Sequence, residues 1–264
     1  MQTLLGLVFI GCGAIFVNYI ATFKPPANNQ IRIIHKSISN PTVKAQHHNI
    51  NLPKPVKYRK ARNNYVDKAV NRLLYRIRHN PNAVQTVISA CSYYGAPVDT
   101  CLTLWWLESS MGLGGDKGGA GGNLALQAIE KLTHPSNSRR WKRFKVNKRD
   151  LLAIANHCGF NAYTVQGSWT GALGPFQFMP ATWIKVAIDG NGDNKACPLN
   201  LQDSAYGAAK YIRNLQRKSG SWNKAIQAYS GGSSAYMRRS ILVRKHFCNI
   251  MQKSMQINLS CSAP

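Results

Sequence analysis

Apolar residues recur at helical spacing through most of the chain that follows residue 63. One face of a predicted first helix carries Val66, Ala69, Val70, Leu73, Leu74 and Ile77. The pattern repeats over 84–91, and Gly95 is placed to end that second helix. It predicts further helices at 99–110, 123–133, 148–158, 202–217, 222–229 and 234–250. Because alternating strand patterns are scarce, we expect a mainly α domain over residues 63–250, followed by a tail over 251–264.

The most apolar stretch of the chain lies at its beginning. Residues 3–23 carry no charge and, as a helix, are long enough to cross a bilayer. We interpret residues 1–23 as a signal anchor or transmembrane segment. A cleaved signal peptide is disfavoured, because no Lys or Arg precedes the apolar run and no small-residue cleavage site follows it. However, Lys24, Arg32 and Lys36 follow directly, and the positive-inside rule would leave the domain in the cytoplasm.

Residues 24–62 have the composition of a solvated spacer. They contain nine Lys or Arg, five Pro, many Asn and no acidic residue. Such a segment cannot bury much apolar surface, so we expect a basic linker that tethers the domain. Nucleic-acid binding by this linker is the alternative, but aromatic residues for base stacking are almost absent from it.

The charge of the whole chain indicates an anionic partner. There are 34 Lys and Arg against nine Asp and Glu, which gives a formal net charge of +25. Nucleic acid, lipid headgroups and a carboxylate-bearing cell wall would all fit this charge. A basic run over 139–149 is interleaved with Trp141 and Phe144. We interpret it as the wall of a groove or a solvated face, rather than as a nucleic-acid patch.

Six cysteines follow the apolar N-terminus: Cys91, Cys101, Cys158, Cys197, Cys248 and Cys261. An even number is compatible with three disulfides in an oxidising compartment, although six cysteines allow fifteen pairings. The alternative is that they are free and buried, since cysteine packs as a small hydrophobic residue.

One glutamate has the surroundings of a catalytic acid. In TLWWLESSMG, Glu108 lies four residues after Leu104 and three after Trp105, on their helix face, and Asp99 is placed to cap this helix. Removal of a carboxyl group from water raises its pKa, which suits a proton donor near neutral pH. The alternative is a surface glutamate at a frayed helix end. Glutamate is rare in this chain, and the second one, Glu130, fits an exposed position in ALQAIEKL.

Two further segments stand out downstream. Residues 167–183 read GSWTGALGPFQFMPATW, in which glycines space a turn around Gln177 and Pro180 is placed at the first position of a helix. In AIQAYSGG, Tyr229 ends an amphipathic helix.

In this order, ESSMG, GSWTGALGPFQFMP and AYSGG resemble the lytic murein transglycosylases, and among them the membrane-bound transglycosylase B group. The resemblance covers roughly residues 85–250. It implies a lysozyme-like domain that acts on peptidoglycan, with Glu108 as its general acid and base. It also implies that Ser168, Gln177, Thr182 and Tyr229 line the glycan groove.

The resemblance is less close at three further positions. Ser230 stands where the family usually has Asn, which puts one substrate contact in doubt. Arg139 and Arg140 correspond to a tandem arginine that lies near the peptide substituents of the sugar, although their spacing from Glu108 is looser here.

The segment DGNGDN places Asp189, Asn191 and Asp193 at the first, third and fifth positions of an EF-hand-like loop, and a related loop occurs in the family. Asn194 replaces the turn glycine and Asn200 the bidentate acid, so a turn without metal is as good an interpretation as a structural calcium site. No zinc-ligand spacing is present.

The resemblance implies a reaction that needs no cofactor. Glu108 would protonate the oxygen between N-acetylmuramic acid (MurNAc) and N-acetylglucosamine (GlcNAc), then accept a proton as the muramic 6-hydroxyl closes a 1,6-anhydro ring. Such an enzyme would work on the periplasmic side of the inner membrane or on a virion, for a secretion, conjugation or phage-entry apparatus. The alternatives are a peptidoglycan-binding scaffold without turnover, a lysozyme-type hydrolase, and a cytoplasmic nucleic-acid binder.

Overall fold

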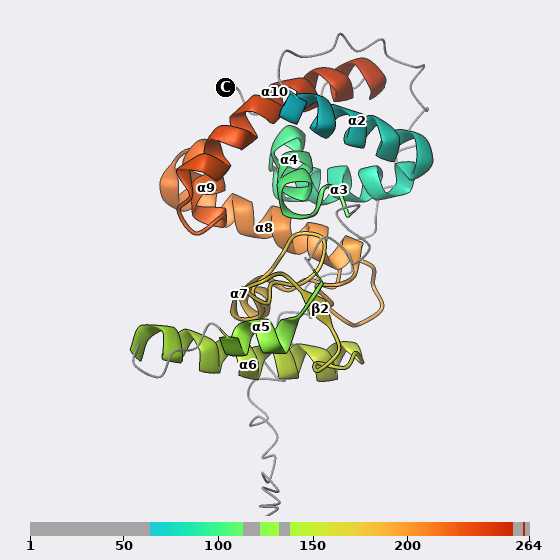
Figure 1. Ribbon diagram of the computed structural model, residues 1–264. Coiled ribbons are helices and arrows are strands. Elements are labelled where there is room, and N and C mark those ends of the chain that lie inside the picture. The colour runs from blue at the N-terminus through green and yellow to red at the C-terminus, as the bar shows by residue number, and fades with distance from the viewer. Residues whose placement is uncertain (1–63, 113–121, 132–137, 256–260, 262–264) are drawn as a thin grey trace, which may run out of the picture.

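The structure is a computed structural model that describes residues 64–112, 122–131, 138–255 and 261 (Figure 1). The predicted anchor and linker over 1–62, and most of the tail, lie outside the described residues. Among the helices that are described, none is long and apolar enough to cross a membrane.

The described chain folds mainly into helices, as the sequence predicted. They are α2 (Asn64–His79), α3 (Pro81–Tyr94), α4 (Val98–Ser109), α5 (Ala125–Lys131), α6 (Ser138–Cys158), α7 (Pro180–Val186), α8 (Leu201–Ser219), α9 (Trp222–Tyr229) and α10 (Ser234–Met255). Two short strands, β1 (Asn123–Leu124) and β2 (Gln166–Gly167), pair antiparallel with Asn123 opposite Gly167.

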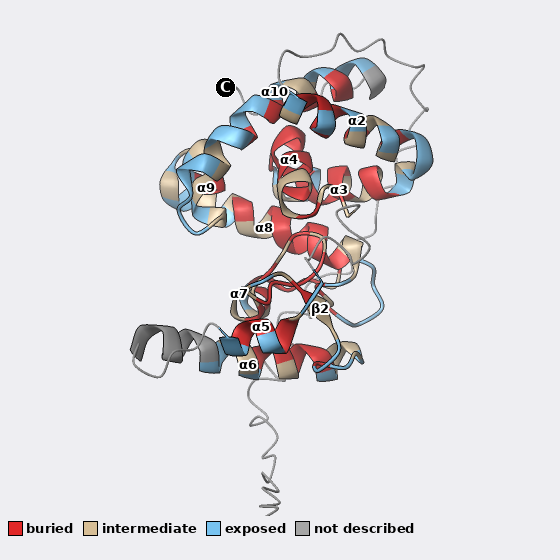
Figure 2. Cartoon of the chain, viewed as in Figure 1, coloured by how far each residue is buried: buried red, intermediate tan, exposed pale blue. Residues whose placement is uncertain are grey.

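The helices form two groups. The larger one contains α2, α3, α4, α8, α9 and α10, and the smaller one contains α5, α6, α7 and the strand pair (Figure 1). Helix α4 lies at the centre of the larger group, and every residue from Val98 to Trp105 is buried (Figure 2). Because residues 98–105 are enclosed on all sides, the apolar residues of α4 are spread around the helix rather than confined to one stripe. The smaller group has its own apolar cluster, centred on Leu126, Leu151 and Leu173.

Two local expectations were wrong. Helix α6 begins ten residues before the predicted residue 148. Its first half is a basic segment without apolar spacing, so periodicity could not detect it. Asp99 does not cap α4, because Pro97 occupies the N-cap position and the helix therefore starts one residue earlier than expected. Asp99 lies in the first turn, is almost fully buried and interacts electrostatically with Arg244 of α10.

The six cysteines form three disulfides, Cys91–Cys101, Cys158–Cys197 and Cys248–Cys261. Cys91–Cys101 joins α3 to α4, and Cys158–Cys197 joins the end of α6 to the segment before α8. The second bond therefore connects the two helix groups.

The disulfide between the two groups should contribute more stability than the one within the larger group. It closes a loop with a sequence separation of 39, against 10 for Cys91–Cys101. In the chain-entropy model this difference predicts a loss of about 4 kcal/mol for Cys158→Ser/Cys197→Ser and about 3 kcal/mol for Cys91→Ser/Cys101→Ser. Denaturant unfolding of the two double variants measures both losses, and the reverse order would contradict the loop-length argument.

Candidate active site

The turn that follows α4 is rigidly built. Ser110, Met111 and Gly112 all have positive φ angles, of 50°, 61° and 70°. The Ser109 hydroxyl donates to the carbonyl of Trp105 and accepts from the amide of Gly112 at 2.8 Å. Strained residues held in this way are typical of functional sites, and here they fix the helix end that carries Glu108.

The Glu108 carboxyl group is largely removed from water. Burial raises its pKa from the usual value of 4.5 to about 7. The hydroxyl of Tyr236, on α10, donates to Oε1 of Glu108 at 2.5 Å, and this hydrogen bond opposes part of the rise. The carboxyl can therefore carry a proton near neutral pH, as the sequence suggested.

A second tyrosine lies close by. Tyr229 donates from its hydroxyl to the carbonyl of Phe176 at 2.9 Å. This hydrogen bond connects the end of α9 to residues 167–183, which are called the middle motif below. Burial raises the pKa of Tyr229 well above its usual range, and the charge of Glu108 raises it further. Glu108, Tyr229 and Tyr236 thus form one cluster, to which α4, α9 and α10 each contribute a side chain.

Close packing explains the glycines of the middle motif. A Cβ atom at Gly174 would lie 1.8 Å from the carbonyl oxygen of Pro198, so no other residue fits there. Gln177 has a φ of 52°, and its side-chain amide donates to the carbonyl of Gly174 at 2.7 Å. Ser168 shapes the preceding turn, because its hydroxyl oxygen accepts from the amides of Thr170 and Ala172.

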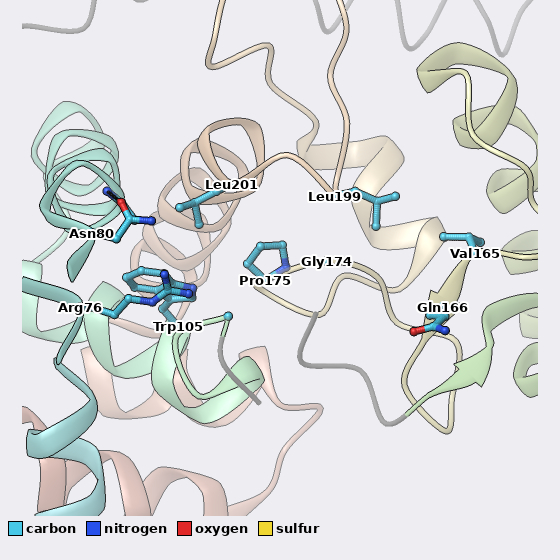
Figure 3. A pocket seen from close by; sticks show the side chains of 11 residues that line it. Arg76, Asn80, Trp105, Val165, Gln166, Gly174, Pro175, Leu199 and Leu201 are labelled. Carbon is cyan, nitrogen blue, oxygen red and sulfur yellow. Dashed lines mark hydrogen bonds between the residues drawn. The ribbon is translucent and has the colours of Figure 1, made fainter. Parts of the chain in front are cut away.

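The structure also contains a cavity of about 440 Å³ (Figure 3). Arg76, Asn80, Trp105 and Gly112 line it from the side of α2, α3 and α4. The middle motif, β2 and the start of α8 line it from the opposite side, with Val165, Gln166, Gly174, Pro175, Leu199 and Leu201. The link between the cavity and the cluster around Glu108 is Trp105, which lies one helical turn before that glutamate on α4.

Comparison with known proteins shows the family to which the chain belongs. A family model described as the transglycosylase SLT domain matches residues 32–252. The chain belongs to this family. No curated protein matches it in sequence.

The fold of this SLT domain is similar to those of solved lytic transglycosylases. SltB1 of Pseudomonas aeruginosa matches with a TM-score of 0.56 and 15% identity, over 74% of this chain and 86% of that one. Slt35 of Escherichia coli, solved with bulgecin A, matches with a TM-score of 0.57 and 15% identity, over 86% and 80%. SltB3 of Pseudomonas aeruginosa, solved with NAG-anhNAM-pentapeptide, matches with a TM-score of 0.54 and 18% identity, over 76% and 66%. The predicted lysozyme-like transglycosylase fold is confirmed.

The other predicted groove residues of the SLT domain differ in their surroundings. Thr182 is half-buried in the first turn of α7. Ser230 follows α9 and donates from its hydroxyl to the carbonyl of Gln227 at 2.8 Å. Arg139 and Arg140 belong to the first turn of α6, and their side chains lie outside the described residues. The substrate contacts of these four residues, like those of Ser168 and Gln177, stay predictions.

Three aromatic residues of the two downstream segments differ in their exposure. Phe176 is 1% exposed and belongs to the core, whereas Trp169 is 72% exposed on the turn that Ser168 shapes. Tyr229 is packed against Tyr211 and Phe178 while its hydroxyl reaches the site. Sequence analysis missed Tyr236, because nothing nearby along the chain marks it and its contact with Glu108 spans 128 residues.

The EF-hand-like loop is organised by hydrogen bonds to its own backbone. Asp189 accepts from the amides of Gly192 and Asn194, and Asp193 accepts from the amide of Lys195 and the side-chain amide of Asn191. Asn200, at the twelfth position, caps α8 instead.

A buried carboxylate that sequence analysis missed anchors this loop from α8. Asp203 accepts from the amides of Gly190, Asn191 and Cys197. In the described part of the chain, no three His, Cys, Asp or Glu side chains gather as ligands. The two interpretations of this loop, a turn without metal and a structural calcium site, both stay predictions.

Tyr236→Phe should shift the pH dependence of the enzyme. The Tyr236 hydrogen bond stabilises the charged form of Glu108, so its removal should raise the pKa of that carboxyl further. We expect the alkaline limb of the rate profile to move up by about one pH unit and kcat to fall about tenfold. Peptidoglycan turnover measured across pH tests this. Tyr94→Phe, a partly buried tyrosine of α3, is the matched control, and an unshifted alkaline limb in Tyr236→Phe would argue against the proposed contact.

Glu108 should also make the stability of the protein depend on pH. Its pKa is raised in the folded state, so the folded protein binds the proton more tightly and loses stability as pH rises from about 4.5 to about 7. Glu108→Gln removes this loss. The free energy of unfolding of the variant, minus that of the parent, should therefore be about 2–3 kcal/mol larger at pH 8 than at pH 4. Thermal melts at both pH values measure this, and parallel pH profiles of parent and variant would show that Glu108 is well solvated.

Proposed function

We propose that this SLT domain cleaves the β-1,4 bond between MurNAc and GlcNAc in peptidoglycan and forms a 1,6-anhydro product. The observation that carries the proposal is the carboxyl group of Glu108, whose pKa is raised to about 7 by burial and which accepts a hydrogen bond from Tyr236. SltB3 was solved with both NAG-NAM-pentapeptide and NAG-anhNAM-pentapeptide, which are a substrate and a product of this kind.

The geometry assigns separate roles to the two oxygens of Glu108. Tyr236 donates to Oε1, so the proton of the neutral acid resides on Oε2 and is available to the glycosidic oxygen. After the bond breaks, the carboxylate accepts the proton of the muramic 6-hydroxyl while that oxygen attacks the anomeric carbon. Because the nucleophile belongs to the substrate, no water has to be activated and no cofactor is needed.

A reaction with two carboxylates is less compatible with the site. Hydrolases that follow the common pattern pair an acid with a second carboxylate. In the described residues, no other carboxylate perturbs the pKa of Glu108. Glu130 forms an exposed ion pair with Lys148 at 2.8 Å, and Asp150 pairs with Arg149 at 2.9 Å.

The proposed place of action is the periplasmic side of the inner membrane, or a virion, with residues 3–23 as the anchor and 24–62 as the tether. Three disulfides support an oxidising compartment, because such bonds rarely persist in a reducing cytosol. The membrane tether and the basic charge would suit local opening of the wall for a secretion, conjugation or phage-entry apparatus.

Digestion of purified peptidoglycan by the full chain tests the proposed reaction. We expect soluble disaccharide peptides that are one water lighter than lysozyme products in mass spectrometry. Glu108→Gln should reduce their release at least 1000-fold, whereas Glu130→Gln, which alters the exposed glutamate, should leave it unchanged.

Each other outcome of the digestion would contradict the proposed reaction in a different way. Products of lysozyme mass would indicate a hydrolase on this fold. Binding without soluble fragments would indicate a scaffold. Full activity of Glu108→Gln would remove Glu108 from its assigned role.

A further inference from the structure

The cavity contains a buried hydrogen-bond donor that pairs with no described residue. Trp105 is 1% exposed, and its indole Nε1 is buried without a hydrogen-bond partner in the described part of the chain. An unpaired buried N–H group costs free energy that a bound acceptor would recover. Since Trp105 lines the cavity, that acceptor can come from a ligand.

Arg76 is held next to this indole. Its Nε donates to the carbonyl of Met111 at 2.9 Å, and its guanidinium lies 5.4 Å from the centre of the Trp105 ring. Figure 3 shows the two side chains together on one wall of the cavity. Among the described residues, no carboxylate forms an ion pair with Arg76. Both contacts fix the guanidinium before a ligand arrives, which lowers the cost of binding.

Gly112 leaves space in front of both donors. A Cβ atom at this glycine would lie 3.1 Å from Nη2 of Arg76 and 3.8 Å from Nε1 of Trp105. The missing side chain therefore marks a point within reach of two N–H groups, one of them charged.

Among the described residues that line the opposite wall, none is acidic. This wall is formed largely by Val165, Pro175, Leu199 and Leu201. Low polarity around the donors strengthens their interaction with a charged acceptor, and a guanidinium is well matched to a carboxylate.

We propose that Arg76 and Trp105 form a carboxylate-binding subsite that recognises an acidic substituent of the glycan strand. The inference rests on the proposed function and deepens it, because it names a substituent that the enzyme recognises in addition to the sugar backbone. A carboxylate can come from the lactyl group of a peptide-free MurNAc or from the stem peptide, and the experiment separates these two sources.

The test measures binding by calorimetry with the full chain carrying Glu108→Gln, which prevents turnover. Three probes are compared: GlcNAc-MurNAc with a free lactyl carboxylate, GlcNAc-MurNAc-tetrapeptide, and chitotetraose, which has no carboxylate. Arg76→Met should raise the Kd of a carboxylate probe about 10- to 100-fold and leave that of chitotetraose unchanged. A higher Kd for the peptide-free disaccharide would identify the lactyl carboxylate as the bound group. A higher Kd for the tetrapeptide probe alone would identify a carboxylate of the stem peptide.

Two more variants separate recognition from folding and from general charge. Trp105→Phe keeps an aromatic ring but removes the N–H group, and it should raise the same Kd about 3- to 10-fold. Arg78→Met removes an exposed charge from the same helix and should leave every Kd unchanged.

The inference is overturned if Arg76→Met raises the Kd of chitotetraose as much as that of the carboxylate probes, or if Arg78→Met raises the Kd of the carboxylate probes as much as Arg76→Met does. It is also overturned if no variant changes any Kd, or if no probe binds. These outcomes are distinct from failure of the proposed function. That failure would appear as a lack of anhydro products when the parent protein digests peptidoglycan.

Discussion

The exclusion of water from one carboxyl group governs this site. Glu108 lies in the last turn of α4, whose preceding residues 98–105 are buried, and its carboxyl group is largely desolvated although the residue keeps part of its exposure. Desolvation raises its pKa to about 7, so the neutral acid is available near neutral pH. The tyrosine hydroxyl on Oε1 then orients the carboxyl group without supplying a charge.

Contacts from the rest of the fold stabilise the end of α4, where desolvation of the Glu108 carboxyl group is unfavourable. The turn at 109–112 is crossed by hydrogen bonds from Ser109 and Arg76, and Cys91–Cys101 secures the first turn of α4 to α3. Tyr229 connects α9 to the backbone of the middle motif. A buried acid that must ionise during turnover destabilises its own fold, so such ties are expected around it.

Sequence predicted those features that depend on neighbours along the chain. Apolar spacing located most of the helices, and the surroundings of Glu108 followed from Leu104 and Trp105 one turn earlier. The start of α6 was missed because its basic residues have no apolar period. Tyr236 and Arg76 were missed for another reason. They reach the site from α10 and α2 through contacts that only the packing of distant helices creates.

The charge of the chain makes the environment of Glu108 more informative. With 34 Lys and Arg against nine acids, most carboxyl groups should have cationic neighbours that lower their pKa. Glu130 and Asp150 each form an ion pair, with Lys148 and Arg149. Among the described residues, no cation contributes to the pKa of Glu108, whose hydrogen-bond partner is a neutral phenol. A lysine or arginine in place of Tyr236 would hold the carboxyl group ionised and unable to donate a proton. The use of tyrosine at this position is therefore what keeps a strongly basic protein capable of acid catalysis.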